Sequence, residues 1–591
     1  MEEEVREEGN RMFGKGRWAR AIAKYGQYIA LLVGDKTDET TRSKLVVGYS
    51  NRAEAWLKVH KYVKALDDCN KALELDNAHL KSLLRKGRAL EGLRMFQEAV
   101  ETYKEILGSS SFDCLSGSVR DSIEISYENA FMKDRQTRFG EIENAFETSW
   151  KLFPAGPDMI ETPPSLEEYV GPVEIRRVPG MGRGLFATRN VQAGELLLVS
   201  NALTTNKIST DDRSELPPLE KKLDHLIYAV EEVVRDAMEN LHDLTQLQRL
   251  IQLDTLGGPY PEDSQYRDAP PMRYFTPVNA LPPGCKSVTA QDMTHPALRN
   301  EFPRAFLRRV IYERQIYQYG KVLKILEIYV LPSLMNHSCL PNVSVMGLRN
   351  ERFSRVFRAS RDIRQGEELF HAYHNIFCPL DERRWLVGGV LCKCSRCSLE
   401  ARLLQECSML NYMASECTDI GSHCDHLSLS TYTEEQLERL KRRCITAITA
   451  VGSLFKDIPK LSALRDDEKD FIRASFVRFY RLLLDPQIKG LPGYSADNLL
   501  SERRLIANII IAMHTCDPAS DLALAMCAEA AKEKPFLYNH ATDSIEPYGE
   551  MEVLLNSGRR ILELTYGPEL TCRSIFKIFV SYEGSLVYLP F

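Results

Sequence analysis

Two short stretches of the chain carry residues whose types and spacing could do chemistry. The first, "SLMNHSCLPNVSV", contains the string Asn336-His337-Ser338-Cys339. The second, "CKCSRC", begins 53 residues after Cys339 and places three thiols close together, at Cys392, Cys394 and Cys397. A histidine beside a cysteine can form a nucleophilic pair, bind a metal or simply pack in a core. Three closely spaced thiols favour a metal site over reduced surface thiols, because exposed free cysteines are poorly tolerated.

The other cysteines and the start of the chain indicate a reducing compartment. The chain has 15 cysteines, and its first residues, "MEEEVREEGN", are acidic and polar, unlike a secretory signal. We therefore expect thiols or metal ligands rather than disulfides, and a location in the nucleus, the cytoplasm or both. A second group, whose spacing matches no metal motif, consists of Cys407, Cys417, His423, Cys424 and His426. Packing thiols on helices are favoured there, and a second metal stays open.

Composition and charge exclude some classes of function. The chain has 591 residues, of which 44% are hydrophobic and 27% charged, as in ordinary globular proteins of three or more domains. No apolar run approaches the roughly 18 residues of a membrane span, so we expect no membrane association. The net charge of −6 offers no global basic field, so direct binding of nucleic acid is not expected.

The first hundred residues contain an internal repeat. Ala65 and Ala99 sit in the same local pattern 34 residues apart, and Ala21 precedes Ala65 by 44 residues, with an insertion near "GDKTDETTRS". A period of 34 residues is typical of tetratricopeptide helix pairs. Gly9, Ala53 and Gly87 fall at the small position of the first helix of each repeat. The alternative is an unrelated helical bundle.

The first helix of each repeat carries cations and amides in phase. This pattern resembles the carboxylate-clamp tetratricopeptide repeats that hold the C-terminal Glu-Glu-Val-Asp tails of heat-shock chaperones. By position, the resemblance implies a clamp made of Arg6, Asn10, Asn51, Lys81 and Arg85. The family usually has lysine where Arg6 stands, which keeps the charge but changes the geometry. A tail ending in aspartate presents two carboxylates that such groups can bind, although a merely solvated charged face is the alternative.

Further along, the hydrophobic pattern changes several times. Residues 119–151 keep helical spacing, and prolines between 154 and 164 then predict a linker. Residues from about 170 alternate and turn at glycines like short strands, whereas 215–255 are helical in spacing. Strand-like sequence returns just before the Asn336 string. A β-rich module is thus split by an insert at about 203–328.

Four motifs occur in order along this split module. They are Gly182-Arg183-Gly184, "NHSCLPN", "RDIRQGEELFHAYHN" and "CKCSRC". Together they resemble the SET-domain protein methyltransferases of the split, SMYD-like branch, over residues 170–400. The insert has only one cysteine, Cys285, so the zinc-binding MYND module of that branch is absent. The N-terminal repeats make the chain similar to plant and fungal SET proteins with tetratricopeptide repeats.

The resemblance implies transfer of a methyl group from S-adenosylmethionine to a lysine of a histone or non-histone protein. It assigns the catalytic role to Tyr373, which also borders the cofactor. The other cofactor contacts would be Gly182, Arg183, Gly184, Asn336 and His337. Without the motif set, Tyr373 would be read as a core aromatic and His337 as a buried core histidine. Cys339 would be the fourth ligand of a structural zinc ion held by Cys392, Cys394 and Cys397.

Two positions depart from the family pattern. An aromatic residue that stacks on the cofactor is replaced by Val390, and a neighbouring tyrosine by Gly388. These departures motivate an alternative function, in which a SET fold with weak catalysis acts as an adaptor or co-chaperone through its repeats.

The predicted fold class is α+β with several domains. Tetratricopeptide repeats occupy residues 1–113 and a helical linker 114–168. A β-rich SET domain with a helical insert occupies 169–376, and a zinc-binding post-SET segment 377–400. A helical domain, expected to line the substrate cleft, occupies 401–591.

Overall fold

The computed structural model divides the chain into two compact units. The first comprises Met1–Glu141, Glu167–Val170 and Ser200–Leu334, and the second Ile142–Leu166, Gly171–Val199 and Met335–Phe591. The residues that the structure describes are 2–33, 38–142, 166–178, 182–202, 204–210, 311–318, 321–329, 331–348, 353–386, 392–422, 429, 431–491, 496–531, 537–539, 544–546 and 552–567.

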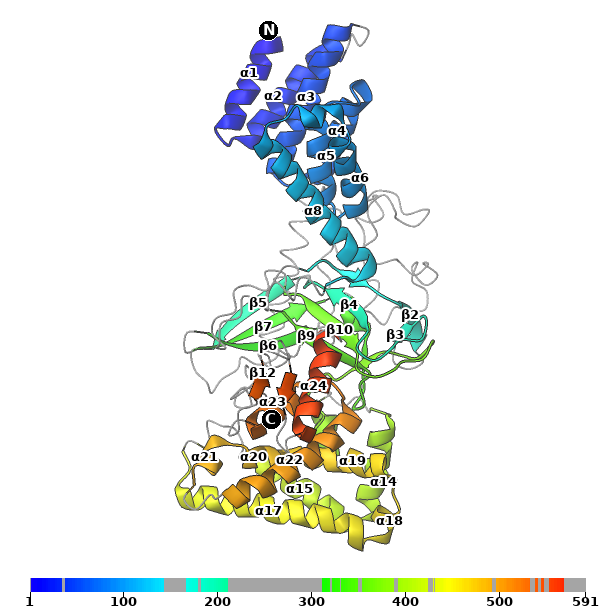
Figure 1. Cartoon of the computed structure of the whole chain (residues 1–591), viewed down its shortest axis with the longest axis vertical. Coiled ribbons are helices and arrows are strands. Elements are labelled where there is room, and N and C mark those ends of the chain that lie inside the picture. Colours follow the sequence, from blue (N-terminus) through cyan, green and yellow to red (C-terminus); the bar gives the residue numbers. More distant parts are fainter. Residues whose placement is uncertain are drawn as a thin grey trace. The chain divides into compact units, whose positions relative to one another are not determined.

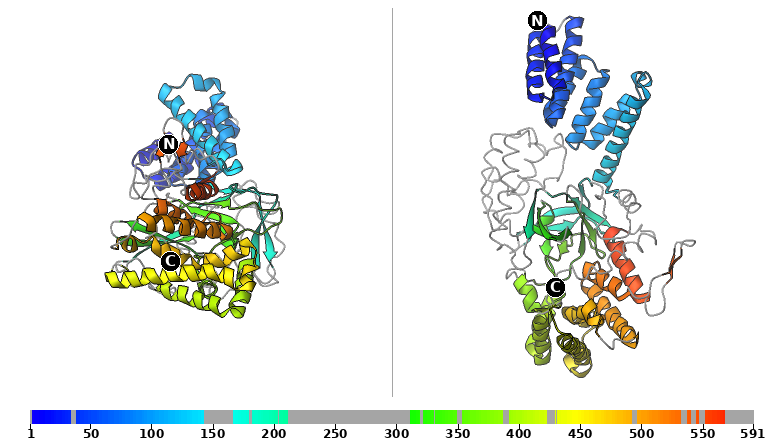
Figure 2. Two further views of the ribbon diagram at one scale, coloured as in Figure 1. Left: turned by 60° about the horizontal axis from the view of Figure 1, so that its bottom comes forward. Right: turned by 90° about the vertical axis from the view of Figure 1, so that its left-hand side faces the viewer.

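The first unit begins with helices packed as antiparallel neighbours, α1 on α2, α3 on α4 and α5 on α6. Their bounds, with those of the two helices that follow, are α1 (Glu2–Gly14), α2 (Trp18–Leu32), α3 (Glu39–Lys58), α4 (Tyr62–Leu75), α5 (Leu80–Gly92), α6 (Phe96–Leu107), α7 (Ser110–Asp113) and α8 (Gly117–Phe139). Figures 1 and 2 show the pairs stacked side by side. The prediction of an N-terminal tetratricopeptide-like region is confirmed.

Small residues allow the paired helices to approach closely. A Cβ atom added at Gly9 would lie 2.7 Å from the Tyr25 ring, and one added at Gly87 would lie 2.6 Å from the Tyr103 ring. Ala53 is fully buried at the equivalent position of the second pair. The repeat therefore depends on a small residue facing a large side chain of the partner helix. Helix α8 continues this core, because Ile123 and Ala130 share a hydrophobic cluster with α5 and α6.

The first unit also contains strands at the two ends of the predicted insert. They are β5 (Thr204–Thr210), β6 (Ile311–Gln318) and β7 (Lys321–Ile328), arranged as an antiparallel sheet in the order β5-β7-β6. The prediction placed 203–328 in an insert that separates the two parts of the β-rich module, whereas the structure has strands at both ends of this segment. The β-branched residues Val322, Ile325 and Ile328 in "KVLKILEI" favour the strand. The segment 215–255, where helical spacing is found, lies outside the described residues. The short elements β1 (Tyr169–Val170) and η4 (Pro332–Leu334) complete this unit.

The described residues of the second unit contain four small β-structures. Strands β2 (Val173–Val178) and β3 (Gly182–Ala187) form an antiparallel hairpin. Strands β4 (Leu196–Ser200), β10 (Arg355–Ala359) and β9 (Val343–Gly347) are hydrogen-bonded neighbours in that order, with Arg355 opposite Gly347. Strand β8 (Asn336–His337) pairs in parallel with β11 (Phe370–His371). A further hairpin joins β12 (Leu537–Asn539) to β13 (Ser544–Glu546).

The rest of the second unit is helical. Its elements are α13 (Leu380–Leu386), α14 (Ser395–Glu406), α15 (Ser408–Ser422), α17 (Glu434–Asp457), α18 (Pro459–Ser462), α19 (Asp466–Arg473), η5 (Ala474–Phe476), α20 (Val477–Leu483), α21 (Pro486–Lys489), α22 (Ala496–Cys516), α23 (Asp521–Ala531) and α24 (Glu552–Tyr566). One hydrophobic core runs through these helices and includes Cys339 and Cys397. Helix α17 begins at a capping box made by Thr433 and Gln436. The predicted C-terminal helical region, and with it the α+β fold class, is confirmed.

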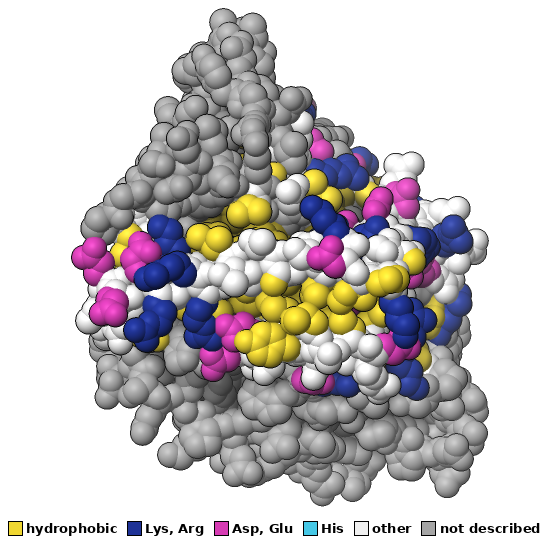
Figure 3. Space-filling model, turned by 90° about the horizontal axis from the view of Figure 1, so that it is seen from below, with side chains coloured by type: hydrophobic (Ala, Val, Ile, Leu, Met, Phe, Trp, Pro, Cys, Tyr) yellow, Lys and Arg dark blue, Asp and Glu magenta, His cyan; other side chains and the backbone are white. Residues whose placement is uncertain are grey.

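Apolar side chains also reach the surface. Figure 3 shows a band of hydrophobic side chains on one face, with charged side chains at its margins. Large exposed apolar residues of the second unit include Met409 and Tyr412 of α15 and Ile445 of α17. Exposed apolar groups of this kind are common on globular proteins and do not by themselves mark a binding site. No described helix is long and apolar enough to cross a membrane.

Candidate functional site

The pairing of β8 with β11 brings two of the sequence motifs together. Asn336 lies opposite Phe370 and His337 opposite His371, in parallel register. Beyond the strands, the Ser338 amide donates to the carbonyl of His371 (3.3 Å). The short string that contains Asn336 and His337 therefore runs directly beside the segment that leads to Tyr373.

A buried asparagine holds this crossing in place. Asn342 is fully buried, and its Oδ1 accepts a hydrogen bond from the Phe370 amide at 2.7 Å. Its Nδ2 donates to the carbonyl of Glu368 at 2.8 Å, and its own amide donates to the carbonyl of Phe370. Asn342 thus replaces regular strand pairing with side-chain bonds where the two segments cross. The "CLPN" turn is part of the site because it places this residue.

Three motif residues converge where Gly184 faces Glu368. Asn336 Nδ2 donates to Glu368 Oε1 at 2.6 Å, and a Cβ atom added at Gly184 would lie 2.4 Å from the same oxygen. Any side chain at Gly184 would therefore displace the carboxylate. Burial raises the pKa of Glu368, and the hydrogen bond from Asn336 opposes the rise. The structure places Gly182 and Arg183 on the same strand, β3, but the Arg183 side chain lies outside the described residues.

Tyr373 lies just after β11 and is fixed at both its hydroxyl and its backbone. The hydroxyl donates to the carbonyl of Met335 at 2.7 Å, and the amide donates to His337 Nδ1 at 3.1 Å. The residue is 46% exposed, so it is not an ordinary core aromatic. A hydroxyl held beside the Asn336 string, on a ring that reaches the surface, can meet a substrate from outside.

The His337 imidazole contacts both Tyr373 and the cysteine cluster. Its Nδ1 accepts from the Tyr373 amide, which leaves the ring proton on Nε2, and Nε2 lies 3.4 Å from Cys339 Sγ. The sequence assigned His337 to the cofactor site and Cys339 to the metal site, as separate roles. In the structure the two residues are in contact, and the His337 imidazole lies between the Tyr373 amide and Cys339 Sγ.

Two more histidines line this region, and the sequence had assigned them no role. The His371 ring lies 4.9 Å from the Tyr373 ring, and the His374 ring lies 4.8 Å from that of His337. Burial lowers the pKa of His371 to about 3 and that of His374 to about 4. Both imidazoles are therefore neutral near pH 7. They place no positive charge beside Tyr373.

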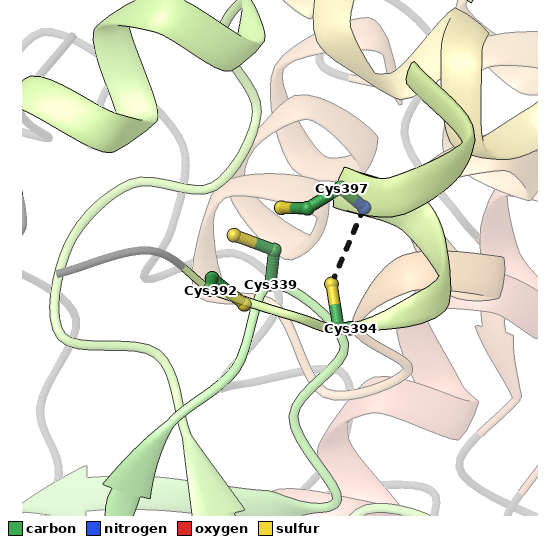
Figure 4. A group of neighbouring side chains, drawn as sticks. All are labelled: Cys339, Cys392, Cys394 and Cys397. Atoms are coloured by element: carbon green, nitrogen blue, oxygen red, sulfur yellow. Dashed lines mark hydrogen bonds between the residues drawn. The ribbon is translucent and has the colours of Figure 1, made fainter. Parts of the chain in front are cut away.

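Four thiols from two separate segments converge on one point (Figure 4). Cys339 follows β8, Cys392 and Cys394 precede α14, and Cys397 lies in the first turn of α14. Their sulfur atoms all lie within 4.8 Å of one another. Hydrogen bonding from the Cys339 thiol lowers the pKa of Cys394 to about 7 and lowers that of Cys392 further. Hydrogen bonds with the same thiols raise the pKa of Cys339. Four thiols this close share protons among their sulfur atoms, unless a bound cation takes the place of those protons.

This donor set fits a zinc ion. Tetrahedral coordination with Zn–S bonds of about 2.3 Å separates the sulfurs by about 3.8 Å, which requires only a small contraction. Because all four positions would be filled by protein, such a site is structural rather than catalytic. No other group of possible metal ligands is found among the described residues. Of the second cysteine and histidine group, Cys417 is buried in the helical core and Cys407 packs against it, whereas His423, Cys424 and His426 lie outside the described residues. Gly388 and Val390 also lie outside them.

Three of the five predicted clamp residues, Arg6, Asn10 and Arg85, interact with the Tyr25 hydroxyl in the first unit. Tyr25 donates to Asn10 Oδ1 at 2.8 Å. Burial raises the pKa of Tyr25, and the guanidinium groups of Arg85 and Arg6 both oppose the rise. The positive charges of Arg6 on α1 and Arg85 on α5 thus both act on the Tyr25 hydroxyl.

The cations of this surface are partly engaged by the chain itself. Arg6 pairs with Glu3, while Arg85 Nε donates to Glu54 Oε2 at 3.0 Å and also bonds Ser50. Lys81 is exposed, and neither its side chain nor that of Asn51 makes a hydrogen bond or ion pair with another described residue. The surface therefore holds both free donors and cations whose acidic partners a carboxylate ligand could replace.

Comparison with known proteins gives a family match for the middle of the chain. Residues 182–374 match the SET domain model. A protein named Methyltransferase from Gibberella zeae is 24% identical over 374 residues, covering 63% of this chain and 47% of that protein. Human sperm-associated antigen 1 is 35% identical over 119 residues, covering 20% of this chain and 12% of that protein. The chain thus spans less than half the length of either relative.

Among the solved structures that resemble the chain are TPR domains that match about a fifth of it. The Arabidopsis OM64 TPR domain is 25% identical with a TM-score of 0.18, covering 22% of this chain and 93% of that domain. The TPR2B domain of yeast Sti1, solved in complex with a pHsp70, is 29% identical with a TM-score of 0.19, covering 22% of this chain and 97% of that domain. These scores are too low to define a fold. The assignment of a tetratricopeptide-like region rests instead on the helix pairs seen directly in the first unit.

Proposed function

Because residues 182–374 form a SET domain, we propose that the chain is an S-adenosylmethionine-dependent methyltransferase that acts on lysine side chains of proteins. One observation carries the proposal most strongly. The pairing of β8 with β11 sets the Tyr373 hydroxyl on the carbonyl of Met335, immediately before Asn336 and His337. The proposal includes a structural zinc ion held by the four-cysteine cluster, which we propose to steady this segment.

The residues of the site have different roles in the proposed methyl transfer. When bound, S-adenosylmethionine supplies an electrophilic methyl group on a positively charged sulfonium. Asn336 and Gly184 hold Glu368 beside the segment proposed to bind this cofactor, so a carboxylate is available to a cationic ligand. Tyr373 orients the incoming amine. A free lysine titrates near pH 10.4, so the amine must lose its proton, and the neutral His371 and His374 impose no added charge.

Cofactor binding tests this proposal against its main alternative. Titration calorimetry with S-adenosylmethionine is expected to give saturable binding to the wild-type chain. Gly184→Ala is expected to weaken binding about tenfold or more, because the added Cβ would displace the Glu368 carboxylate. Gly452→Ala in α17 is the matched control, since an added Cβ there meets nothing within 4 Å. Absence of binding to the wild type at millimolar cofactor would favour the adaptor function, which the departures at Val390 and Gly388 motivate.

We also propose that the repeats dock acidic C-terminal tails, such as the Glu-Glu-Val-Asp ends of cytosolic heat-shock chaperones. Arg6, Asn10 and Arg85 gather around Tyr25, and the free donors of Lys81 and Asn51 belong to the same predicted set. A terminal aspartate carries two carboxylates, and charge-assisted bonds from cations and amides suit both. Substrate recruitment by a chaperone would follow from this arrangement.

Charge reversal at Lys81 tests the docking proposal. Lys81→Glu is expected to weaken binding of a peptide ending in Glu-Glu-Val-Asp about tenfold or more, because an attraction becomes a repulsion. Lys104→Glu makes the same charge change on the exposed part of α6, the other helix of the pair, and should leave affinity within twofold. Fluorescence anisotropy at constant salt measures both. Equal affinity for wild type and Lys81→Glu would refute the clamp.

A further inference from the structure

A buried cluster of charges lies next to the four cysteines. Arg383 of α13 and Arg396 of α14 are 1% and 0% exposed, and Glu400 of α14 is 4% exposed. Arg383 Nη2 donates to Glu400 Oε2 at 2.8 Å, and Arg396 Nε donates to Glu400 Oε1 at 2.9 Å. Two permanent positive charges therefore share one carboxylate.

The other partners of the two arginines are neutral. The Ser475 hydroxyl accepts from Arg383 at 3.0 Å and from Arg396 at 2.9 Å, and it donates to Glu400 at 3.0 Å. The backbone carbonyl of Cys378 accepts a bond from Arg383, and that of Phe471 accepts one from Arg396. In the part of the chain that the structure describes, neither arginine pairs with a second carboxylate. A buried excess charge of this kind is costly unless another anion lies close by.

The cysteine cluster can supply that anion. Arg383 Nη2 also reaches Cys397 Sγ at 3.8 Å. Four thiolates around one divalent cation carry a net charge of about −2. Two further sulfurs accept hydrogen bonds from the chain, Cys339 from His337 Nε2 and Cys394 from the Cys397 amide at 3.4 Å. Arg383 is the charged donor within this set.

We propose that Arg383 is the counter-ion of the metal-loaded cysteine cluster. Glu400 and Ser475 of η5 hold its guanidinium in place, and Arg396 in turn bonds both of them. Ser475 thus ties this group to the C-terminal helices. Arg383 is thus a positioning residue that acts through Cys397 and raises metal affinity. The inference rests on the zinc site of the proposed function, and it adds that zinc loading and packing of the C-terminal helices stabilise each other.

Arg478 offers a matched control for testing Arg383. It is also buried, it lies on α20, and it pairs with Glu382, the residue next to Arg383 in α13. Removing Arg478 breaks a buried ion pair between the same two parts of the unit, without touching a ligand sulfur. A purely structural role for Arg383 predicts that the two variants behave alike.

The experiment measures zinc affinity of the full chain by competition with a chromogenic chelator. Arg383→Met is expected to weaken the affinity about tenfold or more, as loss of an outer-shell partner does at other metal sites. Arg478→Met should lower thermal stability but keep the wild-type affinity. Unchanged affinity in Arg383→Met, or an equal loss in both variants, would overturn the inference.

Two further results keep the test decisive. If Arg383→Met does not fold, Arg383→Lys keeps the charge but loses the fork of donors, and it should bind zinc several-fold more weakly than wild type. Wild-type affinity in Arg383→Lys would then overturn the inference. A wild-type chain that contains no zinc by metal analysis would refute the metal site itself, and failure of cofactor binding alone would leave this inference standing.

Discussion

Tyr373→Phe is expected to lower the rate of methyl transfer about 100-fold or more, while the chain folds normally. The substitution removes only the hydroxyl, which donates to the carbonyl of Met335. The residue is 46% exposed, so the loss to folding stability is about that of one hydrogen bond, roughly 1 kcal/mol. The backbone amide of residue 373 remains bonded to His337, so the segment keeps its path.

Transfer of a radiolabelled methyl group to a panel of histones and cytosolic proteins measures this effect. The loss should appear in kcat rather than in KM for the cofactor, because the hydroxyl orients the amine and does not hold the cofactor. Tyr412→Phe is the matched control, since Tyr412 is exposed on α15 and outside the site. Equal activity of Tyr373→Phe and wild type would remove Tyr373 from the catalytic role, and the labelled proteins would also identify the substrate class.

Much of this site could be predicted because its motifs are local in sequence. The spacing of Cys392, Cys394 and Cys397 limits them to one turn before and into α14, so their proximity follows from covalent geometry. The repeat was predictable for a similar reason. A 34-residue period with a small residue facing an aromatic is a local rule, and Gly9 against Tyr25 obeys it.

What could not be predicted depends on contacts between distant segments. Arg383 lies in a short helix with acidic and basic neighbours and reads as a solvated charge, yet it is buried by η5, more than ninety residues further on. Glu368 reads as one of two acidic residues in "GEEL", and only the approach of Gly184 and Asn336 gives it a special environment. The contact of His337 with both Tyr373 and Cys339 has the same origin. Spacing within one motif carries no information on which side chains the fold brings against it.

The ends of the predicted insert show a second limit. Strands β5 and β7 pair although Thr204 and Ile328 lie far apart in the chain. The partner of a strand is set by tertiary structure, so a boundary drawn where the pattern changes can fall inside a sheet. The β-branched residues of "KVLKILEI" favour a strand but do not name its partner.

Removal of one sulfur ligand is expected to have the second largest effect. Cys339→Ser should abolish stoichiometric zinc and lower the melting temperature of the second unit. The cluster joins the turn after β8 to the start of α14, and Cys339 and Cys397 both lie in the main hydrophobic core. Zinc binding to four thiolates contributes about 10 kcal/mol or more of apparent free energy in small zinc domains, so even partial loss exceeds the effect of a typical core substitution.

Cys417→Ser is the control for Cys339→Ser. Cys417 is fully buried in the same core and donates to the carbonyl of Ser475, a bond that serine can also make, but it is not a member of the cluster. It should keep one zinc per chain by metal analysis and most of its thermal stability. Equal zinc content in Cys339→Ser and wild type would refute the assignment of Cys339 as a ligand.

Loss of the metal should also affect Tyr373, because the His337 side chain contacts both Tyr373 and the cysteine cluster. His337 accepts the Tyr373 amide at Nδ1 and faces Cys339 Sγ at Nε2, so a displaced Cys339 releases the imidazole that holds the tyrosine backbone. Chelation of wild-type zinc is therefore expected to reduce methyl transfer before the chain unfolds, and added zinc should restore it. Activity that survives complete chelation would separate the tyrosine from the cluster, even though the four sulfurs lie together.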